Sequence, residues 1–233
     1  MNAKKDPFFA MDENTVKADG QLKDSQLIRF ENASGKGKKI MFVGNSITLH
    51  GYREEIGWYG EWGMAASKKE NDYVHLLMKK IKKIDPDAAF CICQVANWER
   101  LYKEGESTYH LFEDARRFGA DMIVMRFIEN CPKVDFDGDI FKAEAKGLLS
   151  FLDSKNSAEF IITTGFWRHP GDDAIRALAQ ESGYPLAELG DLGDQDEMKA
   201  IGLFEHRGVS MHPGDKGMRA IADRIFEKVL LFL

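Results

Sequence analysis

The sequence lacks the features that mark several classes of protein. No apolar run among its 233 residues is long enough to span a membrane, and the N-terminus has no apolar segment of the kind found in signal peptides. A net charge of −6 gives no global attraction to nucleic acid or to an anionic membrane surface. We therefore expect a cytoplasmic protein with neither nucleic-acid nor membrane partners.

Cysteine is scarce, and its spacing does not fit a zinc site. The chain has three, Cys91, Cys93 and Cys131, and the first two share one face of an apolar run. This odd number favours buried, reduced thiols over a disulfide or metal ligands. The patterns G-x-G-x-x-G and G-x-x-x-x-G-K-[ST] are also absent, which argues against Rossmann and P-loop phosphate sites.

Short apolar runs alternate with helical periodicity from residue 38 onward. The runs at 39–44, 88–95, 121–128, 159–165 and, more weakly, 185–190 are mostly without polar alternation, which is typical of parallel strands covered on both faces. They predict a three-layer α/β/α sandwich with a mostly parallel, five-stranded, doubly wound sheet. Residues 38–233 form one predicted domain. Residues 1–37 are polar and predict an N-terminal extension or arm, in which 25–33 could form an edge strand.

Helices are predicted between these strands. Ser67 to Glu70 matches a capping box, and the helix that it opens should stop at the Asp85–Pro86 step. Further helices are predicted at 107–118, 139–153, 172–182 and 214–232. Two apolar stripes at helical spacing identify the buried faces of the first and last helices: Tyr73, Val74, Leu77, Met78, Ile81 and Ile84, and then Met218, Ile221, Ala222, Ile225, Val229 and Leu230.

Polar residues follow the predicted strands, where ligands bind in an open parallel sheet. Ser46 follows the first strand and has two interpretations, a helix N-cap or a nucleophile. A serine hydroxyl needs a neighbouring base, and His212, in the loop before the last helix, could supply one. Asn130, after the third strand, could donate an N–H group to a developing oxyanion. These three residues, in this order along the fold, favour the nucleophile.

This combination resembles the SGNH hydrolases, also called GDSL-type esterases and lipases. Gly44-Asn45-Ser46 is similar to their first block, Asn130 to their third, and His212-Pro213 to the end of their last. The resemblance spans residues 38–233. It implies a flavodoxin-like sheet and ester hydrolysis through a serine acyl-enzyme, without a metal or an organic cofactor. It also implies that Ser46 is the nucleophile, that His212 is the general base, and that Asn130 and the Ser46 N–H group form the oxyanion hole.

The chain departs from the family pattern at several positions. The third block, usually G-x-N-D, begins here with Ile128, and residues 94–102 lack the glycine of the second block. A second-block oxyanion donor would therefore be a backbone N–H group near Asn97 or Trp98.

The acid that usually precedes the histidine by three residues is also missing, because Val209 stands there. Without it, either Ser46 and His212 work as a dyad or another group orients the imidazole. The candidates are a backbone carbonyl, Glu205 from the same loop, and Glu129; we assign Glu205 to the catalytic set.

Aromatic residues gather near the expected site. Trp58 and Trp62 lie in the glycine-rich loop 51–67 and could form a wall or lid against an acyl group or sugar ring, or anchor that loop to the core. Trp98 and Trp167 complete the predicted substrate-binding set. His206 and His212 lack the spacing of a zinc site, so no metal site is predicted.

We expect a serine esterase that acts on short-chain acyl esters, acetyl esters first, of a carbohydrate or small metabolite. The polar and aromatic loops suit a small acyl group on a polar carrier better than a long-chain lipid. Two alternatives stay open: a catalytically impaired SGNH-fold binding or interaction module, which Val209 motivates, and a domain that binds a phosphorylated ligand after Gly44. A homo-oligomer is also left open.

Overall fold

The sheet has six strands in the order β1-β3-β2-β4-β5-β6 in the computed structural model, which describes residues 22–233. Five strands are parallel: β2 (Lys39–Gly44), β3 (Ala89–Gln94), β4 (Met122–Arg126), β5 (Glu159–Thr163) and β6 (Leu186–Ala187). The sixth, β1 (Ile28–Glu31), pairs antiparallel with β3 at one edge. The predicted three-layer α/β/α fold is confirmed, with one strand more than the five predicted.

The additional strand lies in the segment that was predicted as an arm with an optional edge strand. Ile28 is buried against the core, and the Oγ atom of Ser25 accepts hydrogen bonds from the N–H groups of Leu27 and Ile28 at the start of the strand. The sheet therefore begins before residue 38. The rest of the predicted arm, residues 1–21, lies outside the described residues.

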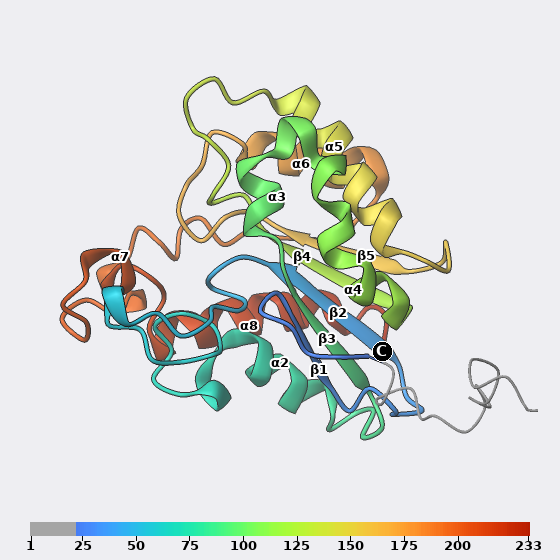
Figure 1. Cartoon of the computed structure of the whole chain (residues 1–233), viewed down its shortest axis with the longest axis horizontal. Helices are drawn as coiled ribbons and strands as arrows, with labels where there is room; N and C mark the ends of the chain where they lie inside the picture. Colours follow the sequence, from blue (N-terminus) through green and yellow to red (C-terminus); the bar gives the residue numbers. More distant parts are fainter. Residues whose placement is uncertain (1–21) are drawn as a thin grey trace, which may run out of the picture.

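Helices cover both faces of the sheet (Figure 1). On one face lie α2 (Tyr73–Ile81) and α8 (Asp215–Val229), which pack against each other and bury one apolar cluster. On the other face, α4 (Glu113–Phe118), α5 (Gly138–Leu152) and α6 (Asp172–Ser182) bury a second cluster. Both faces of the central strands are thus removed from water, which is why their sequences are apolar without alternation.

The first predicted helix boundary is wrong. Asp72, not Ser67, caps α2, because its Oδ1 atom accepts a hydrogen bond from the N–H group of His75 at 2.8 Å. Ser67 instead donates from Oγ and N to the carboxylate of Asp215, at 2.7 and 2.8 Å. Charge-assisted hydrogen bonds of this kind outcompete a local cap. Residues 69–71 form the 3₁₀ helix η3 (Lys69–Asn71).

Helix ends also differ from prediction. α2 stops at Ile81 and α8 at Val229, so Ile84 and Leu230 fall outside the buried stripes and are 52% and 51% exposed. The helix predicted at 107–118 is divided between the 3₁₀ helix η4 (Tyr102–Phe112) and α4.

Shorter elements connect the main ones. They are two short α-helices, α3 (Ala96–Arg100) and α7 (Arg207–Ser210), and the 3₁₀ helices η2 (Glu54–Ile56) and η5 (Asp196–Met198). All three cysteines are buried and free, as predicted. Over residues 22–233, no helix combines the length and the apolar character that crossing a membrane requires.

Candidate active site

Ser46 lies in the tight turn that follows β2. This turn requires glycine at position 44, because a Cβ atom there would lie 1.9 Å from Thr48 Oγ1 and 2.6 Å from the carbonyl oxygen of Arg126. The turn presents the Ser46 hydroxyl to the loop that precedes α8. The Oγ atom of Ser46 lies 2.8 Å from Nε2 of His212, within hydrogen-bond distance. The structure therefore brings together the predicted nucleophile and the predicted base.

The His212 imidazole is held by a backbone carbonyl. Its Nδ1 atom lies 2.7 Å from the carbonyl oxygen of Gly208. A carbonyl oxygen only accepts, so Nδ1 carries the hydrogen, and the lone pair of Nε2 faces the Ser46 hydroxyl. Burial lowers the pKa of His212 to about 4. The neutral imidazole is therefore the form present near pH 7, and it is ready to accept a proton.

The Gly208 carbonyl is free for this contact because α7 is so short. In a continuing helix the N–H group of His212 would bond this oxygen, but it bonds the carbonyl of Val209 instead, at 2.9 Å. The ring of Trp167 packs edge-on against the imidazole, with the ring centroids 5.1 Å apart.

Neither residue 209 nor the two acid candidates, Glu205 and Glu129, makes a hydrogen bond to the His212 ring, whose partners among residues 22–233 are Ser46 and the Gly208 carbonyl. Val209 is 1% exposed and packs in a small apolar cluster with Trp58, Met64, Ala65 and Ala200. Glu205 is exposed, makes no hydrogen bond with His212, and lines a separate pocket beside η2. Assigning Glu205 to the catalytic set is therefore wrong for this geometry. The backbone carbonyl, one of the three alternatives, holds Nδ1.

A buried polar network lies under the serine turn. The Nδ2 atom of Asn45 donates to Oε1 of Glu99 at 2.9 Å and also contacts Glu129. Glu129 forms an ion pair with Arg126 at 2.6 Å, and Asn130 donates from Nδ2 to Oε2 of Glu99, also at 2.6 Å. The network thus connects the turn before Ser46 with the end of β4.

Glu99 and Arg126 were not predicted as site residues. The available signal was a charged residue inside or soon after an apolar run, since a buried charge needs a specific partner: Arg126 lies within the run 121–128, and Glu99 follows the run 88–95. Burial and the neighbouring Glu129 raise the pKa of Glu99 to about 7. Burial also acts to raise the pKa of Glu129, but the guanidinium of Arg126 outweighs it and holds that pKa below its usual value.

The predicted oxyanion donors differ in their hydrogen-bond partners. The N–H group of Ser46 has no hydrogen-bond partner among residues 22–233. Asn130 donates to the same carboxylate as Asn45, the neighbour of Ser46. Asn97 occupies the first turn of α3, where backbone N–H groups lack intrahelical acceptors.

The four tryptophans predicted to bind substrate lie in different environments. Trp167 contacts His212, as described above. Trp98 is fully buried against Phe127 and Phe141, so its prediction as a substrate-binding residue is wrong: its side chain belongs to the core.

Trp58 and Trp62 anchor the loop that follows β2. Trp58 is 2% exposed, donates to the carbonyl of His50 and lies 5.6 Å from the ring of Trp62. Trp62 donates to the carbonyl of Ala66 and lines a pocket of about 390 Å³ beside β1. Figure 1 shows this loop next to α7, and the apolar cluster around Val209 joins the two. The anchoring role, one of the two predicted alternatives, describes this loop.

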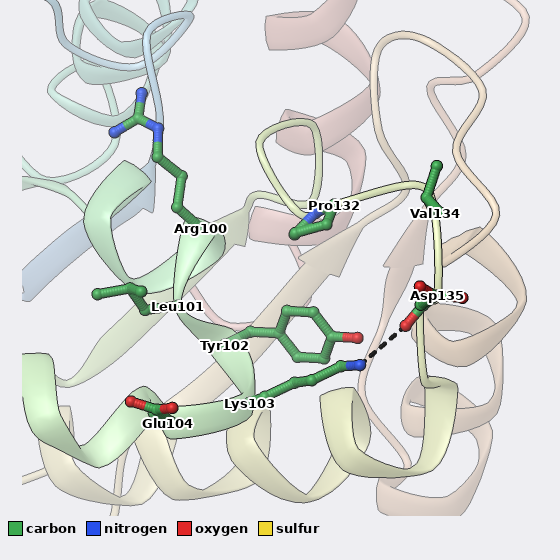
Figure 2. Close-up of a pocket in the computed structure, with 8 residues that line it drawn as sticks. All are labelled: Arg100, Leu101, Tyr102, Lys103, Glu104, Pro132, Val134 and Asp135. Carbon is green, nitrogen blue, oxygen red and sulfur yellow. Dashed lines mark hydrogen bonds between the residues drawn. The ribbon is translucent and has the colours of Figure 1, made fainter.

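A pocket of about 220 Å³ lies beside the network, between the end of α3 and the loop 132–135 (Figure 2). Tyr102 and Lys103 are among its lining residues, and Lys103 donates to the carbonyl of Asp135 at 2.9 Å. Its lining includes Arg100, the residue after Glu99, and Pro132, two residues after Asn130. Neither Ser46 nor His212 lines this pocket. No group of three or more His, Cys, Asp or Glu side chains in the described part of the chain could hold a metal ion.

The comparisons with known proteins come from structure alone. No protein-family model and no curated protein sequence matches the chain. The structure is similar, over 85% of its length, to a two-domain esterase active on acetylated mannans and co-crystallised with mannopentaose (TM-score 0.57, 16% identity, 51% of that chain). This chain therefore spans about half the length of that esterase.

Two further structures show the same likeness. A member of the lipolytic protein G-D-S-L family from Veillonella parvula matches over 84% of this chain and 100% of its own (TM-score 0.53, 14% identity). A family two carbohydrate esterase from Clostridium thermocellum, in complex with cellohexaose, matches over 82% of this chain and 63% of its own (TM-score 0.54, 16% identity).

The chain thus has the fold of the GDSL-type, or SGNH, esterases and lipolytic proteins. Its resemblance to this family, first inferred from three short motifs, is confirmed at the level of the fold. A serine and a histidine stand in hydrogen-bond contact beside the carboxyl end of β2.

Proposed function

We propose that the protein is a serine esterase that hydrolyses short-chain acyl esters, acetyl esters first, of a carbohydrate or small metabolite. The observation that carries this proposal is the 2.8 Å contact between Ser46 Oγ and His212 Nε2, with Nδ1 of the same ring fixed by the Gly208 carbonyl. The carbohydrate esterases among the similar structures support a sugar as the carrier of the acyl group.

Acylation begins when Ser46 Oγ attacks the ester carbonyl carbon and its proton passes to Nε2 of His212. The Ser46 N–H group, the Asn130 amide and a backbone N–H group near Asn97 are the proposed donors to the oxyanion. Collapse of the tetrahedral intermediate breaks the bond to the alcohol oxygen, which takes the proton from His212. Water, deprotonated by the same imidazole, then hydrolyses the acyl-enzyme to the free acid and restores Ser46.

The imidazolium in this cycle has no carboxylate beside Nδ1. The carbonyl dipole of Gly208 fixes the ring but stabilises a positive charge less than an ionised carboxylate does. We therefore propose a Ser–His dyad in which the backbone takes over the orienting role of the acid and only part of its electrostatic role.

The test is hydrolysis of p-nitrophenyl acetate by the wild type, Ser46→Ala and His212→Ala. We expect each substitution to lower kcat by at least about 10³-fold, because nucleophile and base act as a unit. Ser150→Ala and His110→Ala, on exposed residues, serve as matched controls and should keep the wild-type rate. Acetate release from an acetylated manno-oligosaccharide then tests the carrier, and equal rates in all five proteins would exclude the proposal.

A binding module with the same fold is the competing function, and the buried Val209 in place of an acid is the observation that favours it. A fluorophosphonate probe separates the two, since it labels only an activated serine hydroxyl. Labelling of Ser46 in the wild type, lost in His212→Ala, supports the esterase. A folded protein that takes up no label supports the binding module.

A further inference from the structure

Glu99 is the centre of the polar network beneath Ser46. Glu99 lies in α3 and its side chain is completely buried. Its carboxylate accepts three hydrogen bonds. Oε1 accepts from Asn45 Nδ2 at 2.9 Å and from the backbone N–H group of Ile128 at 2.6 Å, while Oε2 accepts from Asn130 Nδ2 at 2.6 Å. One carboxylate therefore joins the residue before the nucleophile to the residue proposed for the oxyanion hole.

The backbone at Ile128 is strained where Glu99 holds it. Ile128 has a φ angle of 147°, which a β-branched residue rarely adopts and which glycine adopts without cost. Glycine is the residue of the family pattern at this position. Such a conformation persists only when its surroundings enforce it. The short hydrogen bond from the Ile128 N–H group to a buried carboxylate is one such constraint.

The carboxylate also fixes the orientation of the Asn130 amide. An ionised carboxylate has no hydrogen to donate, so the side chain of Asn130 must turn Nδ2, not Oδ1, toward Glu99. The Nδ2 group carries a second hydrogen, which this contact leaves available. A neutral amide or an acid at position 99 would allow the opposite orientation.

We infer that Glu99 is a positioning residue, which holds the Asn130 amide as an oxyanion donor and restrains the strained turn at Ile128. This inference rests on the proposed esterase function. It assigns Glu99 no contact with the substrate, because its side chain is buried and all of its partners are protein groups.

The ionisation of Glu99 offers a readout that a purely structural role would not give. The charged groups that face it are Glu129, which raises its pKa, and Arg126, which is paired with Glu129; the Cys131 thiol lies near both glutamates. The pKa of Glu99 is raised to about 7. Because Oε1 already accepts two hydrogen bonds, a proton would go to Oε2, where it opposes the Nδ2 hydrogens of Asn130. We therefore expect kcat to fall as the pH drops through about 7.

The experiment compares the wild type with Glu99→Gln and with Glu106→Gln, a control on an exposed residue of η4. With p-nitrophenyl acetate, Glu99→Gln should lower kcat by about 10- to 100-fold. The upper figure is the effect of losing one oxyanion donor. The KM of the variant should stay within about twofold of the wild-type KM. The step near pH 7 should disappear from its pH profile. Only the limb set by His212, near pH 4, should remain. Glu106→Gln should keep both the rate and the profile.

A double substitution separates positioning from stability. If Glu99 acts through Asn130, Glu99→Gln should cost no further activity in an Asn130→Ala background, whereas independent effects would multiply. If Glu99→Gln fails to fold, as shown by circular dichroism, Glu99→Asp takes its place in the same cycle.

The outcomes also separate this inference from the function on which it rests. An inactive wild type whose Ser46 takes no fluorophosphonate label rejects the esterase itself. An active, Ser46-dependent wild type overturns the role of Glu99 alone in two cases: if Glu99→Gln keeps the wild-type kcat and pH profile, or if the two substitutions multiply.

Discussion

Nδ1 of His212 donates its hydrogen to the carbonyl oxygen of Gly208 at a distance of 2.7 Å. Val209, the next residue along the chain, holds the sequence position at which the family carries an acid. Its side chain lies in an apolar cluster at 1% exposure. In this protein the residue that binds Nδ1 is therefore not the residue at the acid's position. The backbone of Gly208 accepts the hydrogen bond, and the side chain of Val209 packs in the apolar cluster.

Restoring the acid by Val209→Asp should not restore a triad. The new carboxylate would sit among the apolar side chains of Trp58, Met64, Ala65 and Ala200, and burying an unpaired charge costs roughly 3–5 kcal/mol. We expect a lower unfolding free energy, measured by urea denaturation, and a kcat no higher than that of the wild type. Val209→Ala is the control for lost packing and should cost only about 1–3 kcal/mol. A faster Val209→Asp variant would show that residue 209 can reach the imidazole.

Burial of the His212 ring depends in part on Trp167, whose indole packs edge-on against it at 5.1 Å. Because burial is the largest cause of the low pKa of His212, about 4, Trp167→Ala should raise that pKa toward the ordinary value near 6.5. The measurement is an NMR titration of the His212 ring protons. Trp98→Phe, a substitution in the opposite cluster of the core, should leave the titration unchanged. An unchanged His212 pKa in Trp167→Ala would show that other groups shield the ring.

The parts of the fold predicted well are those with strong periodicity. The strand runs are buried on both faces and the stripe of α8 is regular, so the layers followed from hydrophobic pattern alone. From the sequence, the edge strand β1 is one of two alternatives for residues 25–33, because it is only four residues long and its pairing with β3 depends on a contact that is distant in sequence. The helix boundary at Ser67 failed for the same reason, since Asp215 lies 148 residues away.

In the site, too, residues in local motifs were predicted, and residues that depend on contacts distant in sequence were not. Ser46 and His212 were predicted because each is part of a short motif, and the structure places them in contact. Glu99 could not be assigned a role, because its three partners lie on segments 29 to 54 residues away. Trp98 was misplaced because a residue after a strand can point either toward the site or into the core, and its neighbour Glu99 takes the site side.

Gly44 and Gly51 flank the serine turn and make a matched pair. A Cβ atom at Gly44 would meet Thr48 Oγ1 at 1.9 Å and backbone at 2.6 Å, whereas at Gly51 nothing lies within 4 Å. Gly44→Ala should therefore displace the turn and cost roughly 1–3 kcal/mol or more, as overpacking does. It should also lower kcat by moving Ser46 away from His212. Gly51→Ala should preserve both. Thermal unfolding and p-nitrophenyl acetate hydrolysis measure the two effects, and equal behaviour of the variants would contradict the close packing at Gly44.

His75 ties β1 to α2 through two carboxylates. Its Nδ1 atom lies 2.7 Å from Asp72, and its Nε2 atom lies 3.2 Å from Glu31. Burial alone would lower the pKa of His75, but hydrogen bonds to both acids outweigh it and raise the pKa to about 9. The folded pKa exceeds the unfolded value of about 6.5, so this stabilisation is fully present below pH 6.5 and is lost as the pH rises through about 9.

The shift corresponds to roughly 3 kcal/mol at most, since one pKa unit is about 1.4 kcal/mol. The unfolding free energy of the wild type, measured by urea denaturation, should therefore lose this contribution between pH 6.5 and 9. His75→Gln should be less stable than the wild type at pH 6.5 and should approach it at pH 9. The difference between the two proteins removes the contribution of other titrating groups, such as Glu99. His110→Gln, on an exposed residue, should follow the wild type throughout. A constant gap between His75→Gln and the wild type would mean that His75 contributes packing and not charge.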